Sequence, residues 1–293
     1  MNTTTTSAMP SRPGAAGPTV PLIEHRAPAA LRGPGLLSRR ARERIAAAAA
    51  PLALLSLWEL AVRMGMLDLR FFPAPSQIAQ TFWTMAFTAP WDQSLGYHTL
   101  VSLSRALIGF LFGALPAVAL GAVMGLVPIV RAALQPLIGA LFPIPKVAIL
   151  PLLMLIFGIG EESKWAIIAV GVFFQVLIAT AAGVGNIERI YLDVGQNFRA
   201  GRLNRYATIA LPGALPMIFA GLRLGWGSAL LLLVTAEMVS SQSGIGFVIW
   251  RAWQLLTVED MYVGLIVIAV VGICTFSLLD ALERRLLPWK ART

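Results

Sequence analysis

Several ionisable or amide side chains lie inside long apolar stretches of this 293-residue chain, and five of them are candidates for a solute pathway. Polar groups at membrane depth are costly, so they usually face a partner or a polar cavity. Glu237 lies fourteen residues after Arg223 and on nearly the same face, about 21 Å further along a helix. These two side chains therefore cannot pair within one helix, but each could contact a polar solute. The candidate pathway residues are Arg223, Glu237, Gln175, Arg105 and Lys146.

Each candidate also has a simpler interpretation. Arg105 and Lys146 could extend their charged ends to the membrane interface. Glu237 precedes a run of polar residues, so a structural or gating role at an outer vestibule and plain exposure both fit. Gln175 could form a hydrogen bond between helices. No series of carboxylates suited to relaying protons is visible, so we expect the energy for any transport to come from elsewhere.

Known catalytic motifs are absent. No lysine stands in the Gly-Lys-Ser/Thr pattern that cradles phosphates, so we expect no ATP hydrolysis by that route on this chain. Neither a nucleophile elbow nor a paired-histidine metalloprotease motif occurs. Cys274 is the only cysteine, and His25 and His98 are the only histidines, so no metal site or cofactor is expected. The chain is not predicted to be an enzyme.

Composition places the chain in a membrane. Hydrophobic residues make up 57%, charged residues 13%, and the mean hydropathy is +0.76; soluble domains carry about twice that charge. The net charge of +9 does not indicate nucleic-acid binding, because the basic residues lie at the ends of apolar runs. Residues 1–43, rich in Thr, Pro, Gly, Ala and Arg, are predicted to be a disordered cytoplasmic arm preceding a transmembrane domain over residues 44–290.

Apolar runs long enough to cross a bilayer predict an all-α membrane protein with six transmembrane helices. Gly109, Gly113, Gly121 and Gly125 form small-residue repeats in the second span, which predicts a close helix–helix contact. The third span contains three prolines, so it is either a packed, kinked helix or a broken helix lining a pathway. The spans are 45–65, 99–127, 134–158, 164–185, 213–239 and 261–282.

The distribution of positive charge predicts cytoplasmic N- and C-termini, because cytoplasmic loops are enriched in Lys and Arg. In this orientation the outer loops hold Arg70, Lys164 and Arg251. The inner side holds sixteen basic residues: Arg12, Arg26, Arg32, Arg39, Arg40, Arg42, Arg44, Arg131, Arg189, Arg199, Arg202, Arg205, Arg284, Arg285, Lys290 and Arg292.

The segment 186–212 is a basic, amphipathic loop between the fourth and fifth spans. Its apolar residues recur at helical spacing, with Gly201 between two stripes, and four arginines outnumber two acids. On the cytoplasmic face such a helix–turn–helix would dock a partner; the alternative is an interfacial helix on anionic lipid.

This loop resembles the EAA loop of binding-protein-dependent ABC importer permeases, whose pattern ends in Ile-x-Leu-Pro. Ile209, Leu211 and Pro212 match that end, Asp193 stands at the Glu position, and Val194 and Gly195 stand at the two Ala positions. Arg199 replaces the family's Gly. Further stretches resemble the nitrate/sulfonate/taurine branch of the family: residues 143–164, 219–238, 243–247 and 278–289.

The resemblance implies a type I ABC importer permease fold with a cytoplasmic coupling helix. The residues expected in the ATPase-coupling loop are Asp193, Val194, Gly195, Arg199, Gly201, Arg202, Arg205, Ile209, Leu211 and Pro212. The expected partners are ABC ATPase subunits, a periplasmic or lipid-anchored solute-binding protein, a second copy of the chain, and membrane lipid, with no nucleic acid. The expected location is the bacterial inner membrane.

The resemblance also implies a substrate: a small anion such as nitrate, an aliphatic sulfonate or taurine. The alternatives are a self-sufficient ion-coupled secondary transporter, an importer of a non-anionic small solute such as a thiamine-precursor pyrimidine, and a membrane-embedded assembly subunit with no translocation role.

Overall fold

The computed structural model describes residues 39–187, 201, 208 and 210–289, and these residues form helices and loops without a strand. Contacts divide the chain into two units, Met1–Leu52 and Ala53–Thr293. In the first unit the described part is the beginning of α1 (Arg39–Arg63). This helix begins before the predicted end of the N-terminal arm at residue 43, because its Arg, Ala and Glu residues are good helix formers. The rest of that arm, residues 1–38, lies outside the described residues.

The second unit contains the end of α1 and the later helices that the structure describes. They are α2 (Pro75–Trp83), α3 (Leu95–Leu126), α4 (Pro128–Leu141), α5 (Lys146–Phe157), α6 (Glu161–Gly185), α9 (Leu211–Ser240), α10 (Ile245–Leu255) and α11 (Val258–Leu286). Short η1 (Thr84–Thr88) and η2 (Trp91–Gln93) turns lie between α2 and α3.

Four described helices, α3, α6, α9 and α11, are long and apolar enough to cross a membrane. The pair α4 and α5 forms a fifth candidate, bent by 96° at its break. The predicted third span is therefore interrupted, which agrees with the broken-helix alternative, and Pro151 lies within α5 rather than at the break. The first predicted span, 45–65, overlaps α1, and the total of six stays a prediction.

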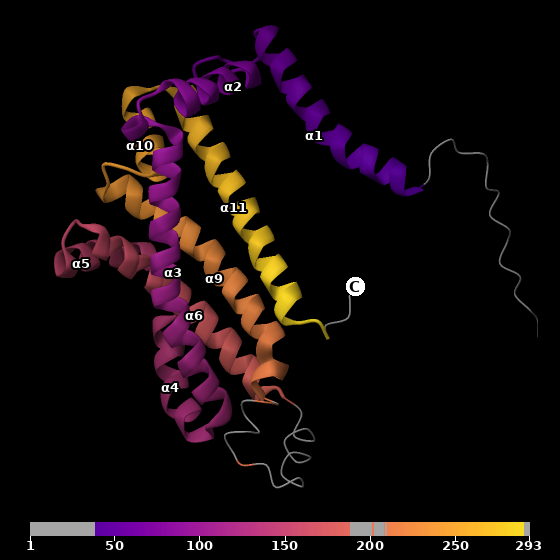
Figure 1. The fold of residues 1–293 in the computed structure, drawn as a ribbon. Helices are drawn as coiled ribbons and strands as arrows, with labels where there is room; N and C mark the ends of the chain where they lie inside the picture. Colours follow the sequence, from indigo (N-terminus) through magenta and orange to yellow (C-terminus); the bar gives the residue numbers. More distant parts are fainter. Residues whose placement is uncertain (1–38, 188–200, 202–207, 209, 290–293) are drawn as a thin grey trace, which may run out of the picture. The chain divides into compact units, whose positions relative to one another are not determined.

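Helices α3, α6 and α9 pack side by side and form the core (Figure 1). The predicted glycine face of α3 is confirmed as a contact with α6. A Cβ on Gly109 would lie 2.6 Å from Ile168 Cβ, and a Cβ on Gly125 would lie 2.5 Å from Val184 Cβ. Both contacts advance by sixteen residues, so α3 and α6 run in the same direction with their backbones in close approach.

Helix α9 packs on the other side of α6 and runs in the opposite direction. Gly183 of α6 faces Met217 near the start of α9, whereas Gly171 faces Leu232 further along it. Phe110 of α3 meets Trp226 of α9 edge to face, with ring centroids 5.1 Å apart. This three-helix core fixes the positions from which the polar residues project.

Candidate functional site

A buried ionic cluster joins α3, α6, α9 and the start of α10, and we call it the Arg105 cluster (Ser102, Arg105, Glu161, Glu237 and Ser243). The Arg105 guanidinium donates to both oxygens of Glu161 at 2.6 Å, to Glu237 Oε1 at 2.8 Å, and to the carbonyl and hydroxyl oxygens of Ser243 at 2.7 and 3.0 Å. All five N–H donors of the guanidinium are thereby used.

The Glu237 carboxylate is equally saturated. Its side chain is fully buried and accepts hydrogen bonds from Ser102 Oγ at 2.9 Å and from the backbone N–H of Gly246 at 2.9 Å, besides Arg105. The Ser102 hydroxyl in turn accepts from the Ile245 N–H at 2.8 Å. These bonds attach the first turn of α10 to α3 and α9.

The chain turns into α10 at Gly244, which has a φ of +105°. A Cβ at this position would collide with the Glu237 carboxylate, so the close approach itself requires glycine. The Gly244 N–H donates to His98 Nδ1 at 3.1 Å. His98 therefore takes part in the connection between α3 and α10 as an acceptor.

The charges of the Arg105 cluster are balanced locally. Lys164 Nζ lies 3.6 Å from Glu161 and donates to the Gly160 carbonyl at 3.0 Å, so two cations face two carboxylates. Arg105 is 4% exposed, which contradicts the interpretation that it extends to the interface. Glu237 is 0% exposed, so the interpretation that it is merely exposed is also wrong. Its hydrogen-bond partners come from other helices. The donors and acceptors of the cluster are thus occupied by groups of the protein itself.

Lys146 follows the break between α4 and α5 and satisfies the carbonyl groups that the break leaves free. Its ammonium donates to the carbonyls of Leu141, Phe142 and Ile144 at 3.2, 2.6 and 2.8 Å. A cation at these carbonyls also complements the negative end of α4. The Phe174 ring lies 4.9 Å below the ammonium. Lys146 thus stabilises the interruption within the membrane-depth segment.

A cavity of about 310 Å³ lies against this break, between α6 and α9. Gln175 and Ser228 line it, and Gln175 Nε2 donates to Ser228 Oγ at 2.6 Å. The predicted helix–helix hydrogen bond of Gln175 is therefore present. Gln175 Oε1 is buried, and no described group donates to it. The residues around the cavity are Phe142, Ile144, Pro145, Lys146, Val147, Gly171, Gln175, Ser228, Leu231 and Leu232.

Arg223 is paired with the end of α11. Its guanidinium lies 2.6 Å from Asp280 Oδ1 and also forms a hydrogen-bonded ion pair with Glu283. Two carboxylates therefore offset its charge. The attraction between Arg223 and an anionic solute is weaker than its position in the sequence indicated.

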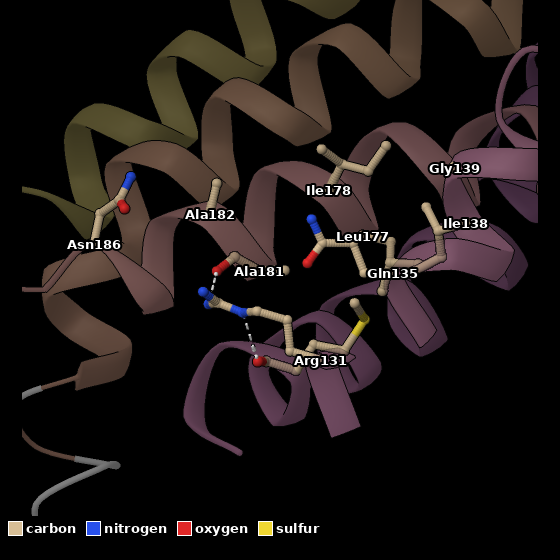
Figure 2. Close-up of a pocket in the computed structure, with 10 residues that line it drawn as sticks. Arg131, Gln135, Ile138, Gly139, Leu177, Ile178, Ala181, Ala182 and Asn186 are labelled. Atoms are coloured by element: carbon tan, nitrogen blue, oxygen red, sulfur yellow. Dashed lines mark hydrogen bonds between the residues drawn. The ribbon is translucent and has the colours of Figure 1, made fainter. Parts of the chain in front are cut away.

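A second cavity, of about 420 Å³, lies between α3, α4 and α6 (Figure 2). Arg131 of α4 extends across it and donates to the carbonyl oxygens of Met124 and Ala181 at 3.2 and 3.3 Å. The remaining lining is largely apolar, apart from Gln135 and Asn186. Arg131 therefore ties α4 to the other two helices near the point where the basic loop begins.

The predicted coupling loop lies largely outside the described residues. Gly201 is exposed, and Leu211 and Pro212 form the first turn of α9. Asp193, Val194, Gly195, Arg199, Arg202, Arg205 and Ile209 belong to the part that is not described.

The sequence interpretation missed the partners of the intramembrane charges, which are Ser102, Glu161, Ser243, Asp280 and Glu283. The available signal was the sign of the charges: Glu161 lies just before the fourth predicted span, and Asp280 and Glu283 lie at the end of the last one, where acids could compensate arginines in other spans. Among the described residues, no group of His, Cys, Asp or Glu could hold a metal ion.

Comparison with known proteins gives a consistent result. Residues 109–288 match the family described as "Binding-protein-dependent transport system inner membrane component". The chain is 34% identical to the taurine transport system permease protein TauC of Escherichia coli, over 80% of this chain and 86% of that protein.

Two further relatives have related names. The putative aliphatic sulfonates transport permease protein SsuC of Bacillus subtilis is 33% identical, over 82% of this chain and 86% of that protein. The nitrate import permease protein NrtB of Leptolyngbya laminosa is 29% identical, over 92% of this chain and 96% of that protein.

Proposed function

The chain belongs to the family of binding-protein-dependent transport system inner membrane components, and from this premise we propose that it forms the translocation pathway of an ATP-driven importer for a small anion. It is an ABC transporter permease of the nitrate/sulfonate/taurine branch, with the type I permease fold and several membrane-spanning helices. The solute, the energy source and the partners are the parts that we propose.

The broken helix beside a cavity is the observation that supports this role best. Irregular backbone at membrane depth is tolerated where protein buries it or where it lines a cavity, and interrupted helices form the solute sites of many transporters. Here the break between α4 and α5 adjoins a cavity of about 310 Å³ that holds Lys146 and Gln175. Of the five candidate pathway residues, these two line the cavity, and the other three are paired with carboxylates or arginine elsewhere.

The relatives' names favour a small anion, namely taurine, an aliphatic sulfonate or nitrate. Lys146 supplies a positive charge at the cavity. We propose that Arg223 stabilises the contact between α9 and α11 and does not contact the solute.

ATP hydrolysis would take place on separate ABC ATPase subunits, and an external solute-binding protein would deliver the solute. We propose that loop 186–212 docks on the ATPase and that its arginines supply much of the contact, with both chain termini in the cytoplasm. A second copy of the chain would complete the pathway, and membrane lipid would cover the apolar faces that remain.

Reconstituted uptake tests this proposal. The chain is placed in proteoliposomes with a candidate ABC ATPase and a candidate solute-binding protein from the same organism, and uptake of labelled taurine, ethanesulfonate and nitrate is measured. We expect uptake that requires ATP and both partners and that an uncoupler does not reduce. Uptake by the chain alone that collapses with an uncoupler would instead identify an ion-coupled carrier.

Charge reversal tests the docking loop separately. A chain carrying Arg199→Glu, Arg202→Glu and Arg205→Glu should bind the purified ATPase at least tenfold more weakly, because long-range attraction and contact are both lost. The matched control reverses Arg70 and Arg251, which are exposed residues assigned to the outer side. Equal binding by both variants would contradict the docking role.

A further inference from the structure

Arg131 is held in a fixed position between the end of α3, the start of α4 and the end of α6 (Figure 2). Pro128 has no N–H, so the Met124 carbonyl cannot accept the usual helical bond from four residues later. Arg131 Nε donates to this carbonyl at 3.2 Å, and Nη2 donates to the Ala181 carbonyl at 3.3 Å. A Cβ on Gly185 would collide with the guanidinium, so the group lies directly against the last turn of α6.

The Arg131 guanidinium keeps hydrogen-bonding capacity that the described residues do not use. A guanidinium has five N–H groups, and the two bonds to carbonyls leave three of them, on Nη1 and Nη2. Among the described residues, no carboxylate pairs with Arg131, so no ion pair offsets its positive charge. Adjacent N–H groups on Nη1 and Nη2 form the fork that binds a phosphate through two parallel hydrogen bonds.

The space beside Arg131 is largely apolar and continues along α6. A further cavity, of about 460 Å³, is also lined by α3, α4 and α6, next to the break between α4 and α5, and none of its lining side chains is polar. From Ala181 in the Arg131 cavity to Val170 in this one, the lining of α6 extends over about 17 Å. The hydrocarbon layer of one bilayer leaflet is about 15 Å thick. The two cavities together therefore have the length of a lipid acyl chain.

We infer that these two cavities form one binding site for an anionic phospholipid. The phosphate accepts from Nη1 and Nη2 of Arg131, and an acyl chain lies along α6 toward the break. A long apolar space with a cation at one end matches an amphipathic lipid, whereas a free anion would leave the apolar part empty. Basic pockets between membrane helices bind lipid headgroups on the cytoplasmic side, where the charge distribution places Arg131. The site is separate from the cavity at Lys146, and the inference does not depend on the transported solute.

Thermal unfolding of the purified full-length chain in detergent tests the site, because a ligand that binds the folded state raises the Tm. Phosphatidylglycerol, which is anionic, and phosphatidylcholine, which is zwitterionic, are titrated separately with identical acyl chains. We expect phosphatidylglycerol to raise the Tm at about fivefold lower concentration, the ratio that corresponds to about 1 kcal/mol for one arginine at an anionic lipid. Equal responses to the two lipids, or no response to either, would overturn the inference.

Two further ligands distinguish a lipid from its headgroup alone. Inorganic phosphate and glycerol phosphate carry the anion without an acyl chain, so neither should raise the Tm at concentrations at which phosphatidylglycerol gives its full effect. A response to inorganic phosphate equal to that of the lipid would assign Arg131 to a free anion and overturn the lipid site.

A variant then assigns the headgroup contact. Arg131→Met should remove the preference for phosphatidylglycerol over phosphatidylcholine. Because the measured quantity is a ratio between two lipids, it stays informative even though the loss of the two carbonyl bonds lowers the starting Tm. Arg284→Met is the matched control, since Arg284 is an exposed arginine on the same predicted side, and it should keep the wild-type preference. A preference that persists in Arg131→Met, or that Arg284→Met also removes, would overturn the assignment.

Discussion

Arg105, Lys146 and Arg223 are stabilised at or near membrane depth by three different means. Arg105 is buried and bonded to two carboxylates, Lys146 donates to carbonyls of an interrupted helix, and Arg223 is half-exposed and paired with the end of α11. Because burial is deepest at Arg105, the loss of that side chain should have the largest effect on stability.

The first prediction concerns Arg105→Met. Removing one partner of a buried ion pair leaves a charge without compensation, here on Glu237, which is 0% exposed. The free energy of unfolding, measured by titration with a denaturing detergent, should fall by about 3–5 kcal/mol. Arg251→Met, at an exposed position, is the control and should change little. Equal stability of the two variants would mean that the Arg105 cluster contributes no net stabilisation.

At the scale of helices, the contact between α3 and α6 depends on the absence of side chains. A Cβ on Gly113 would lie 2.5 Å from the backbone oxygen of Ala169, which cannot move without shifting α6. Gly139 of α4 is also within a helix, but a Cβ there would meet nothing within 4 Å. The two positions therefore separate close packing from intrinsic helix propensity.

Gly113→Ala should destabilise the protein by about 1–3 kcal/mol, because it overpacks a close helix contact. Gly139→Ala should leave stability unchanged or raise it by up to about 1 kcal/mol, since alanine is the better helix former. Both are measured by the same unfolding titration. A stabilising effect of Gly113→Ala would show that α3 and α6 can separate at no cost.

At the scale of the whole molecule, local sequence patterns predicted much of the helix structure. They did not predict which distant residues form pairs. The four-residue spacing of glycines predicted the face of α3 that meets α6, and Pro143, Pro145 and Pro151 predicted that the third span is not a regular helix, without deciding between a kink and a break. In contrast, the bonds from Arg105 reach residues 56 and 132 positions away, which no periodicity reports. The polarity of Arg105 and Glu237 was therefore visible in the sequence, but their mutual compensation was not.

Orientation in the membrane is the molecule-wide prediction on which the docking role of loop 186–212 depends. Cysteine labelling can test it, because the chain has a single cysteine, Cys274, which is exposed and can be replaced by serine. Two single-cysteine variants are then compared. Gly201→Cys places a thiol at an exposed position in the loop, and Arg70→Cys places one at an exposed position on the opposite predicted side of the membrane.

With a membrane-impermeant maleimide, the thiol at position 70 should react in intact cells, and the thiol at position 201 should react only in inverted vesicles. The reason is the positive-inside bias, which places the four arginines of the loop in the cytoplasm. Reaction at position 201 in intact cells would put the loop beyond the reach of a cytoplasmic ATPase. Energy would then have to enter the transporter at another surface, and the charge-reversal variants should have no effect on uptake.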